Sequence, residues 1–265
     1  MTAPLARAYV SVRGPGAADY LQRMVSNDVE GLGVGAACEA LLLTAKARVI
    51  AVLTVIRRAE DDFLLLTEPE LGDVVRDHLL RFRFAARAEI EAEEHASVVV
   101  LGDAVEAPAG ALAVPTSAYG VPGVELVDGA APDDARAVGE DELEVLRIRA
   151  GTARFGSDVD DRVLPAEAGL VERAVDFDKG CYPGQEPIAR LHYRGHANRG
   201  LRVLTLEAAE PPAHDTEVLL AGKKVGRVTS AVRDNGRVVA LAYVRSEVPA
   251  DAVLDVGGAE ARALD

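Results

Sequence analysis

The sequence predicts an α+β protein whose C-terminal part is a separate all-β module. Strand patterns with hairpin turns alternate with amphipathic helices over residues 1–150. After about Gly200 the pattern changes to short strands with no convincing helix. Turn signals separate these strands at short intervals, which is typical of a small barrel or sandwich. The chain is therefore expected to fold as α+β followed by all-β.

In the first part, apolar residues recur with period two in the strands and with helical spacing in the helices. The expected strands are 9–12, 40–43, 48–56, 63–67, 97–101, 111–114 and 124–127. The expected helices are 17–26, 69–82 and 141–150. Pro69 suits the first turn of a helix, and Gly151 suits the position after a helix end. His78 lies on or beside the apolar face of its helix, where packing is the expected role.

The last part is divided by hairpin signals. Asn235-Gly236 is a strong turn signal, and Gly222-Lys223 marks a second turn. The expected strands are 201–206, 217–220, 225–232, 238–244 and 252–256. We therefore predict a C-terminal β-barrel over residues 197–265, after a larger region over residues 1–196.

Composition excludes several classes of protein. The chain has 265 residues and a net charge of −14, so strong direct binding to nucleic acid is not expected. No run approaches the length of a membrane span, and residues 1–10 have no apolar core of a signal peptide. Cys38 and Cys181 form no C-x-x-C pair, so neither a metal site nor a disulfide framework is predicted. These features favour a reducing compartment, the cytoplasm.

One stretch, Lys179 to Glu186, is unusually rich in chemical groups. Its glycines and proline break regular structure, so a loop is expected, and loops of this kind often carry function. Cys181 is the candidate nucleophile, redox thiol or transient metal ligand, with packing in a tight loop as the alternative. Lys179 would lower the pKa of this thiol if the two side chains converge. Cys38, in an apolar strand pattern, is expected in the core.

The other residues of this stretch each have two interpretations. Tyr182 can stack on a flat ring or anchor the loop in the core. Gly180 and Gly184 are expected to supply positive φ or close approach. Gln185 and Glu186 can hold the loop or contact a ligand. The run that begins at Arg190 contains no acidic residue through Arg202, so it suits an anionic ligand, or is a solvated loop or edge strand.

The stretch resembles the K-G-C-Y-x-G-Q-E signature of the YgfZ family, with Pro183 at the free position. Flanking segments are also similar to the family pattern, and they extend the resemblance over most of the chain. These segments are 20–29, 154–156, 165–170, 189–190, 226–230 and 240–244.

The resemblance implies the fold of the glycine cleavage T-protein, an aminomethyltransferase. Two α+β subdomains, the inner one at roughly 36–104, and the C-terminal barrel would surround a central pocket for tetrahydrofolate. The family supports iron–sulfur enzymes, including some that modify tRNA, so folate and such enzymes are the implied partners. The implied catalytic residue is Cys181. The implied cofactor-binding residues are Lys179, Tyr182, Gln185, Glu186, Arg190 and Arg149.

Two departures from the aminomethyltransferases stand out. Ala51 and Val52 occupy the place of a catalytic aspartate, and neither can exchange a proton. Arg149 occupies the place of a pterin-reading glutamate, although a carboxylate suits the N–H groups of a pterin better. Glu167 or Glu172 can substitute for it.

Three functions remain as hypotheses. The first is a folate-binding accessory protein for iron–sulfur enzymes. The second is a folate-dependent aminomethyltransferase, which is the reaction expected if the protein is an enzyme. The third is a non-catalytic scaffold that keeps the fold without folate.

Overall fold

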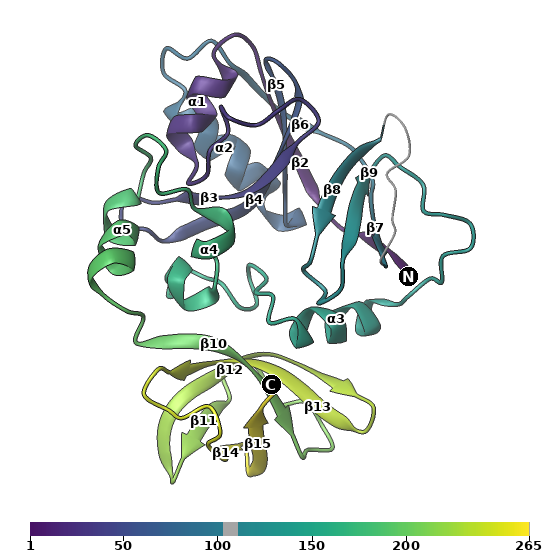
Figure 1. Cartoon of the computed structure of the whole chain (residues 1–265), viewed down its shortest axis with the longest axis vertical. Helices are drawn as coiled ribbons and strands as arrows, with labels where there is room; N and C mark the ends of the chain where they lie inside the picture. Colours follow the sequence, from purple (N-terminus) through teal and green to yellow (C-terminus); the bar gives the residue numbers. More distant parts are fainter. Residues whose placement is uncertain (103–110, 265) are drawn as a thin grey trace.

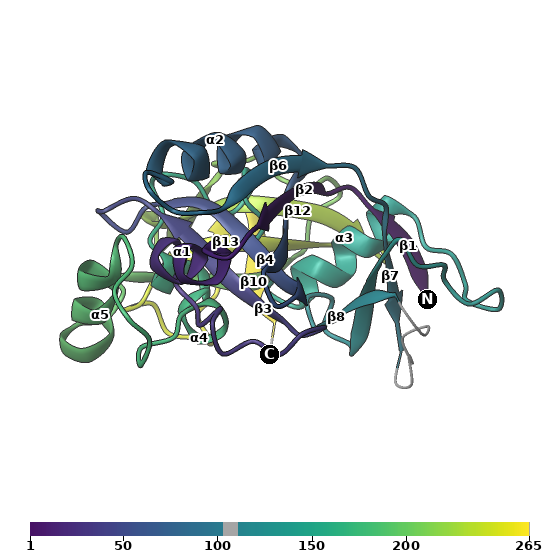
Figure 2. The ribbon, with the colours of Figure 1, turned by 90° about the horizontal axis from the view of Figure 1, so that it is seen from above.

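The computed structural model describes residues 1–102 and 111–264, which form two α+β modules, a linking segment and a C-terminal barrel (Figure 1). The first module lies at the top of Figure 1, the second on the right and the barrel at the bottom. Seen from above, the second module and helix α5 (Gln185–Arg194) lie at opposite ends of the molecule (Figure 2). The predicted α+β class with a C-terminal all-β barrel is confirmed.

The first module is a five-stranded sheet with strand order β3-β4-β5-β2-β6. Its strands are β2 (Ala8–Arg13), β3 (Ala37–Leu43), β4 (Val49–Ala59), β5 (Asp62–Thr67) and β6 (Glu89–Glu93). Helices α1 (Ala17–Met24) and α2 (Gly72–Phe82) cover one face, and a single turn, η1 (Pro69–Leu71), precedes α2. Both faces of the sheet are buried, which explains the continuous apolar runs of β3 and β5.

The second module is a four-stranded sheet with strand order β1-β7-β9-β8. Its strands are β1 (Thr2–Leu5), β7 (Ser97–Leu101), β8 (Leu112–Thr116) and β9 (Gly123–Val127). Helix α3 (Glu140–Arg149) packs Leu143 and Leu146 against one face of this sheet. Gly151 has a φ of 71° just after the helix, as the sequence predicts.

The predicted inner subdomain at roughly 36–104 does not follow these sheets. Strand β2 precedes that range but belongs to the first sheet, whereas β7 lies within it but belongs to the second. The end of the range, at 104, lies outside the described residues. Strands β1 and β6 are not among the expected strands, because β1 is only four residues long and β6 has three glutamates among its five residues.

The linking segment between α3 and the barrel contains η2 (Pro165–Ala168), α4 (Val171–Ala174) and α5. The loop expectation for the whole Lys179–Glu186 stretch is wrong at its end, because α5 begins at Gln185. A proline in the first turn of a helix removes only an N–H that has no intrahelical partner, so Pro187 does not prevent the helix. Of the run from Arg190 to Arg202, expected as a loop or edge strand, the first five residues are the second half of α5, and a loop and the first strand of the barrel follow.

The C-terminal module is a closed barrel with strand order β10-β13-β12-β11-β14-β15. Its strands are β10 (Arg199–Leu206), β11 (Glu217–Leu220), β12 (Lys223–Asp234), β13 (Arg237–Arg245), β14 (Leu254–Val256) and β15 (Ala259–Ala263). Asn235 and Gly236 have φ values of 48° and 86° between β12 and β13, which confirms the hairpin turn. In the described part of the chain, no helix is long and apolar enough to cross a membrane.

A buried carboxylate joins the barrel to the rest of the protein. Asp158 is 1% exposed, and its Oδ2 accepts a hydrogen bond of 2.7 Å from Arg147 of α3. Its Oδ1 accepts from Thr229 and from Ser230 of β12. Tyr243 of β13 donates to the main-chain oxygen of Asp158 over 2.9 Å. A buried charge with this many partners ties three elements to one point.

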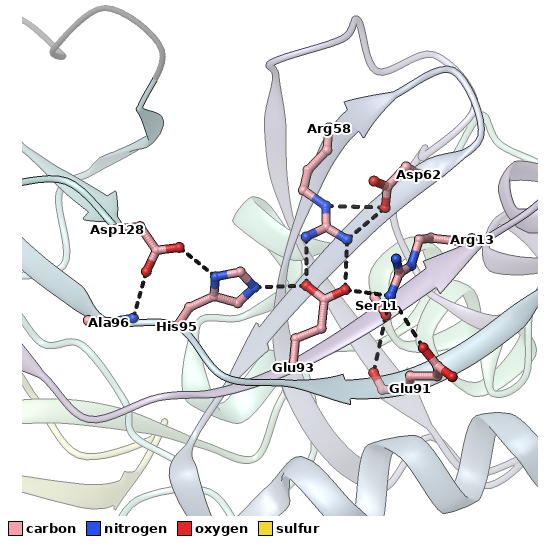
Figure 3. Close-up of polar contacts among 9 residues, drawn as sticks. All are labelled: Ser11, Arg13, Arg58, Asp62, Glu91, Glu93, His95, Ala96 and Asp128. Carbon is pink, nitrogen blue, oxygen red and sulfur yellow. Dashed lines mark hydrogen bonds and ion pairs between the residues drawn. The ribbon is translucent and has the colours of Figure 1, made fainter.

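A second polar cluster joins the first two modules (Figure 3). His95 lies between Glu93 of the first sheet and Asp128 beside the second, with N–O distances of 2.8 and 2.6 Å. Hydrogen bonds from Arg58 lower the pKa of Glu93 to about 2. Partial burial disfavours the protonated ring of His95 and so lowers its pKa. The two carboxylates stabilise the protonated ring more strongly, so the pKa of His95 lies above its ordinary value.

This cluster gives a pH dependence of stability. A pKa raised by folding means that the contribution of His95 is present below about pH 6.5 and is lost as the pH rises through the folded pKa. Glu93 and Asp128 stay ionised in this range, because both have lowered pKa values. The free energy of unfolding of the wild type should therefore fall as the pH rises above about 6.5. In His95→Gln we expect this fall to be smaller, by about 1 kcal/mol or less.

The measurement is urea denaturation at several pH values. His196→Gln is the control, since His196 is exposed and makes no hydrogen bond to a described residue. Identical pH slopes for wild type and His95→Gln would show that the cluster contributes nothing.

Candidate functional site

A central cavity of about 640 Å³ lies where the two α+β modules and the linking segment meet. Its walls come from the β1–β2 connection, β4, η1, α3, the 152–157 loop and Arg173 of α4. This volume is in the range of small-molecule sites. None of the described barrel residues is in its lining. The barrel instead holds α3 in place through Asp158.

The arginines of the central cavity are all engaged by carboxylates. Arg7 forms a bidentate pair with Glu125, and Arg173 lies 3.0 Å from Glu39. Arg147 and Arg154 both contact Glu144. These four positive charges are therefore each paired with a carboxylate of the protein itself.

Glu68 differs from the other carboxylates just described. Its side chain makes no hydrogen bond or ion pair with any described residue. Burial raises the pKa of Glu68 above its ordinary value, although the positive charge of Arg7 acts in the opposite direction. The residue before a proline is held in an extended conformation, and Glu68 has φ −60° and ψ 146° before Pro69. The cavity therefore presents an acceptor that lacks a donor.

The strand position of the missing aspartate also faces this cavity. Val52 of β4 is in the lining, whereas Ala51 is fully buried under the helices of the first module. Neither residue can act as an acid or a base. The prediction that this site lacks the catalytic carboxylate of the aminomethyltransferases stays a prediction.

Lys179 acts as a structural staple, which means that its side chain holds the Lys179–Glu186 stretch against the end of α1. Its Nζ donates to the main-chain oxygens of Gln22, Val25 and Asn27, each at 2.7 Å. These oxygens lie at and just beyond the end of α1, where carbonyl groups lack helical partners. Burial lowers the pKa of Lys179 to about 8. Its three N–H groups are directed at these oxygens, so the structure does not bring its charge to the Cys181 thiol as the sequence suggested.

Tyr182 anchors the loop in the core. Its ring is 7% exposed and packs among residues of β3 and α4, and its hydroxyl makes no hydrogen bond to a described residue. Burial raises its pKa to about 12. Gly184 has a φ of 84°, and a Cβ there would lie 2.7 Å from the oxygen of Thr44, so glycine is required. Gly180 meets neither condition.

The two thiols have different environments. Cys181 is exposed and is in the lining of neither the central cavity nor the groove described next. The implied role of Cys181 as the catalytic residue stays a prediction. Cys38 is partly buried, and burial raises its pKa to about 12. No cluster of three or more potential metal ligands occurs among the residues that the structure describes.

The remaining candidate residues are scattered. Glu186 and Arg190 line a second cavity beside α5, which we call the α5 groove, and Gln185 lines neither cavity. Arg149 pairs with Asp234 of the barrel and also lines neither cavity, so a role for it in binding a ligand there is not supported. Glu167 pairs with Arg199, and Glu172 lines the α5 groove, so neither replaces a carboxylate of the central cavity.

The comparisons with known proteins agree with this architecture. No protein-family model matches the chain. The chain is 27% identical over 290 residues to the tRNA-modifying protein YgfZ of Sodalis glossinidius, covering 97% of this chain and 88% of the relative. It is also 27% identical to an iron–sulfur cluster assembly factor IBA57 homologue from Pyricularia oryzae, covering 100% of this chain and 76% of the relative.

Among solved structures, the glycine cleavage system aminomethyltransferase T from Bartonella henselae matches with a TM-score of 0.84 at 19% identity. The match covers 99% of this chain and 84% of that chain. The chain thus has a T-protein-like fold. Within that class of fold, the complete signature and the near full-length matches make the chain similar to the YgfZ proteins.

The staple role of Lys179 can be tested by substitution. Lys179→Met removes all three hydrogen bonds and leaves part-buried carbonyl groups without donors. We expect the free energy of unfolding to fall by about 2 kcal/mol in urea denaturation. Cys181→Ala is the matched control in the same loop, with an expected change within about 0.5 kcal/mol. Equal stability of the two variants would remove the staple role.

Proposed function

We propose that this protein is a YgfZ-like folate-binding accessory protein that supports iron–sulfur enzymes, including enzymes of tRNA modification. The names of two relatives support this, since one is a tRNA-modifying protein and the other an iron–sulfur cluster assembly factor. The two free cysteines agree with action in a reducing compartment, the cytoplasm.

The central cavity is the proposed site of tetrahydrofolate, and the free carboxylate of Glu68 is the observation that carries this proposal. The pterin ring presents several N–H donors, and Glu68 is an acceptor in the cavity that has no partner among the described residues. Leu143, Phe155 and Tyr119 provide apolar wall for a flat aromatic body. Tetrahydrofolate would supply one-carbon units at this place when bound.

Aminomethyl transfer is the second candidate, and the shared fold favours it. The side chain of Val52 argues against it, because a hydrocarbon at that wall can neither accept a proton nor stabilise a developing cation. Folate therefore serves this protein in a role that does not require a carboxylate on β4. An assay for folate-dependent one-carbon transfer distinguishes the two functions.

The exposed Cys181 is proposed to act on a partner protein. A thiol on the surface is accessible to another macromolecule, whereas a ligand enclosed in the central cavity does not reach it. Lys179, Tyr182 and Gly184 fix the loop on either side of this thiol. We therefore interpret the Lys179–Glu186 signature as a rigidly held loop that exposes one reactive side chain, that of Cys181.

Folate binding is tested by titrating tetrahydrofolate into the purified protein by calorimetry. We expect saturable binding that Glu68→Ala weakens about tenfold or more, because a charge-assisted hydrogen bond is lost. Arg149→Ala is the control and should bind as wild type does, since Arg149 lies outside the cavity. No saturable binding by the wild type would favour the scaffold hypothesis.

The role of Cys181 is tested in bacterial cells that lack their own YgfZ protein. Cys181→Ala should fold normally, because the residue is exposed, but should fail to restore an iron–sulfur enzyme activity that the deletion impairs. Cys38→Ala removes the other thiol and should restore it. Full restoration by Cys181→Ala would exclude the thiol from the mechanism.

A further inference from the structure

The α5 groove is a second cavity of about 640 Å³, and it shares no lining residue with the central cavity. It lies between α5, η2 and α4, at the end of the molecule opposite the second module (Figure 2). One face of α5 forms a wall of this groove, through Glu186, Arg190 and Arg194 at successive turns. Its volume is in the range of small-molecule sites.

The floor of the α5 groove is apolar. Ala47, Pro165, Val171 and Ile188 are buried beneath it, and Leu191 lies in its wall. Only Ile188 of the ten residues of α5 is buried, so this helix is held mainly from one side. Such a floor can bind an apolar group of a ligand by excluding water from it.

The rim of the α5 groove carries positive charges without partners. Arg190 and Arg194 make no ion pair or hydrogen bond with any residue in the described ranges, whereas all four arginines of the central cavity do. A planar guanidinium binds carboxylate and phosphate groups through paired hydrogen bonds.

Two carboxylates also line the α5 groove. Glu186 lies in the first turn of α5, about 12 Å along the helix from Arg194. Glu172 comes from α4. An anionic group is therefore favoured near Arg194 and disfavoured near Glu186, which gives the groove a direction.

From this geometry we infer that the α5 groove binds a small amphiphilic anion, with its apolar body on the floor and its carboxylate or phosphate at Arg190 and Arg194. The groove is distinct from the folate site, so this inference stands independently of the proposed function.

The test uses two probes with the same apolar body. The anionic probe is 1-anilinonaphthalene-8-sulfonate, and the uncharged one is N-phenyl-1-naphthylamine. Fluorescence titration of the native protein should give one site for each. In Arg190→Gln/Arg194→Gln, the affinity for the anionic probe should fall about tenfold or more, and that for the uncharged probe should stay within about twofold. Circular dichroism checks that the variants fold.

Three further variants sharpen the result. Glu186→Gln should strengthen binding of the anionic probe about twofold, because it removes a repulsive charge. Arg233→Gln/Arg237→Gln, on exposed positions of the barrel, should leave binding unchanged, as should Glu68→Ala in the central cavity. Competition by octanoate against octyl phosphate identifies which anionic head group the groove prefers.

Several outcomes would overturn the inference. Unchanged binding of the anionic probe to Arg190→Gln/Arg194→Gln would remove the arginines from the site. An equal loss in the barrel variant would show a general charge effect. Loss of binding in Glu68→Ala would place the probe in the central cavity.

Discussion

The buried pairing of Asp158 with Arg147 is the interaction on which the arrangement of modules depends. A carboxylate that is 1% exposed is stable only when its charge is matched, and α3 and the barrel both supply partners. The same Arg147 also binds Glu144 through 2.6 Å and 2.9 Å contacts, and both side chains line the central cavity. The barrel therefore shapes this cavity without entering it, because it fixes the helix that forms one wall.

The signature stretch divides into residues that build the loop and one residue that the loop displays. Lys179 binds the end of α1, Tyr182 packs against β3 and α4, and Gly184 allows the backbone to pass Thr44 closely. Each of these contacts reaches an element far away in the sequence, so the composition of the stretch could suggest chemistry but not the partners. Cys181 is exposed, and it is in the lining of neither cavity.

The sequence predicts the elements well where the apolar pattern is strong, as in β4, α2 and the barrel hairpins. It misses β6, whose three glutamates in five residues resemble a polar loop, and α5, whose Pro187 and preceding Gly184 resemble a loop signal. The sequence does not show which charged side chains of the cavities lack a partner. Whether Glu68 or Arg190 is unpaired depends on pairs between residues that are distant in sequence, such as Arg7 with Glu125. The resemblance predicts Arg149 in the pocket, but its partner Asp234 lies on the barrel.

The short helix α4 connects the two cavities physically. Arg173 faces the central cavity, while the neighbouring Val171 and Glu172 line the α5 groove. Ser26, which is fully buried, holds this helix by donating to the oxygen of Ala174 while accepting from the amide of Leu41. Lys179 donates hydrogen bonds to the main-chain oxygens of Val25 and Asn27, on either side of Ser26. The loop that carries Cys181 and helix α4 are therefore held by the same short segment, residues 25–27.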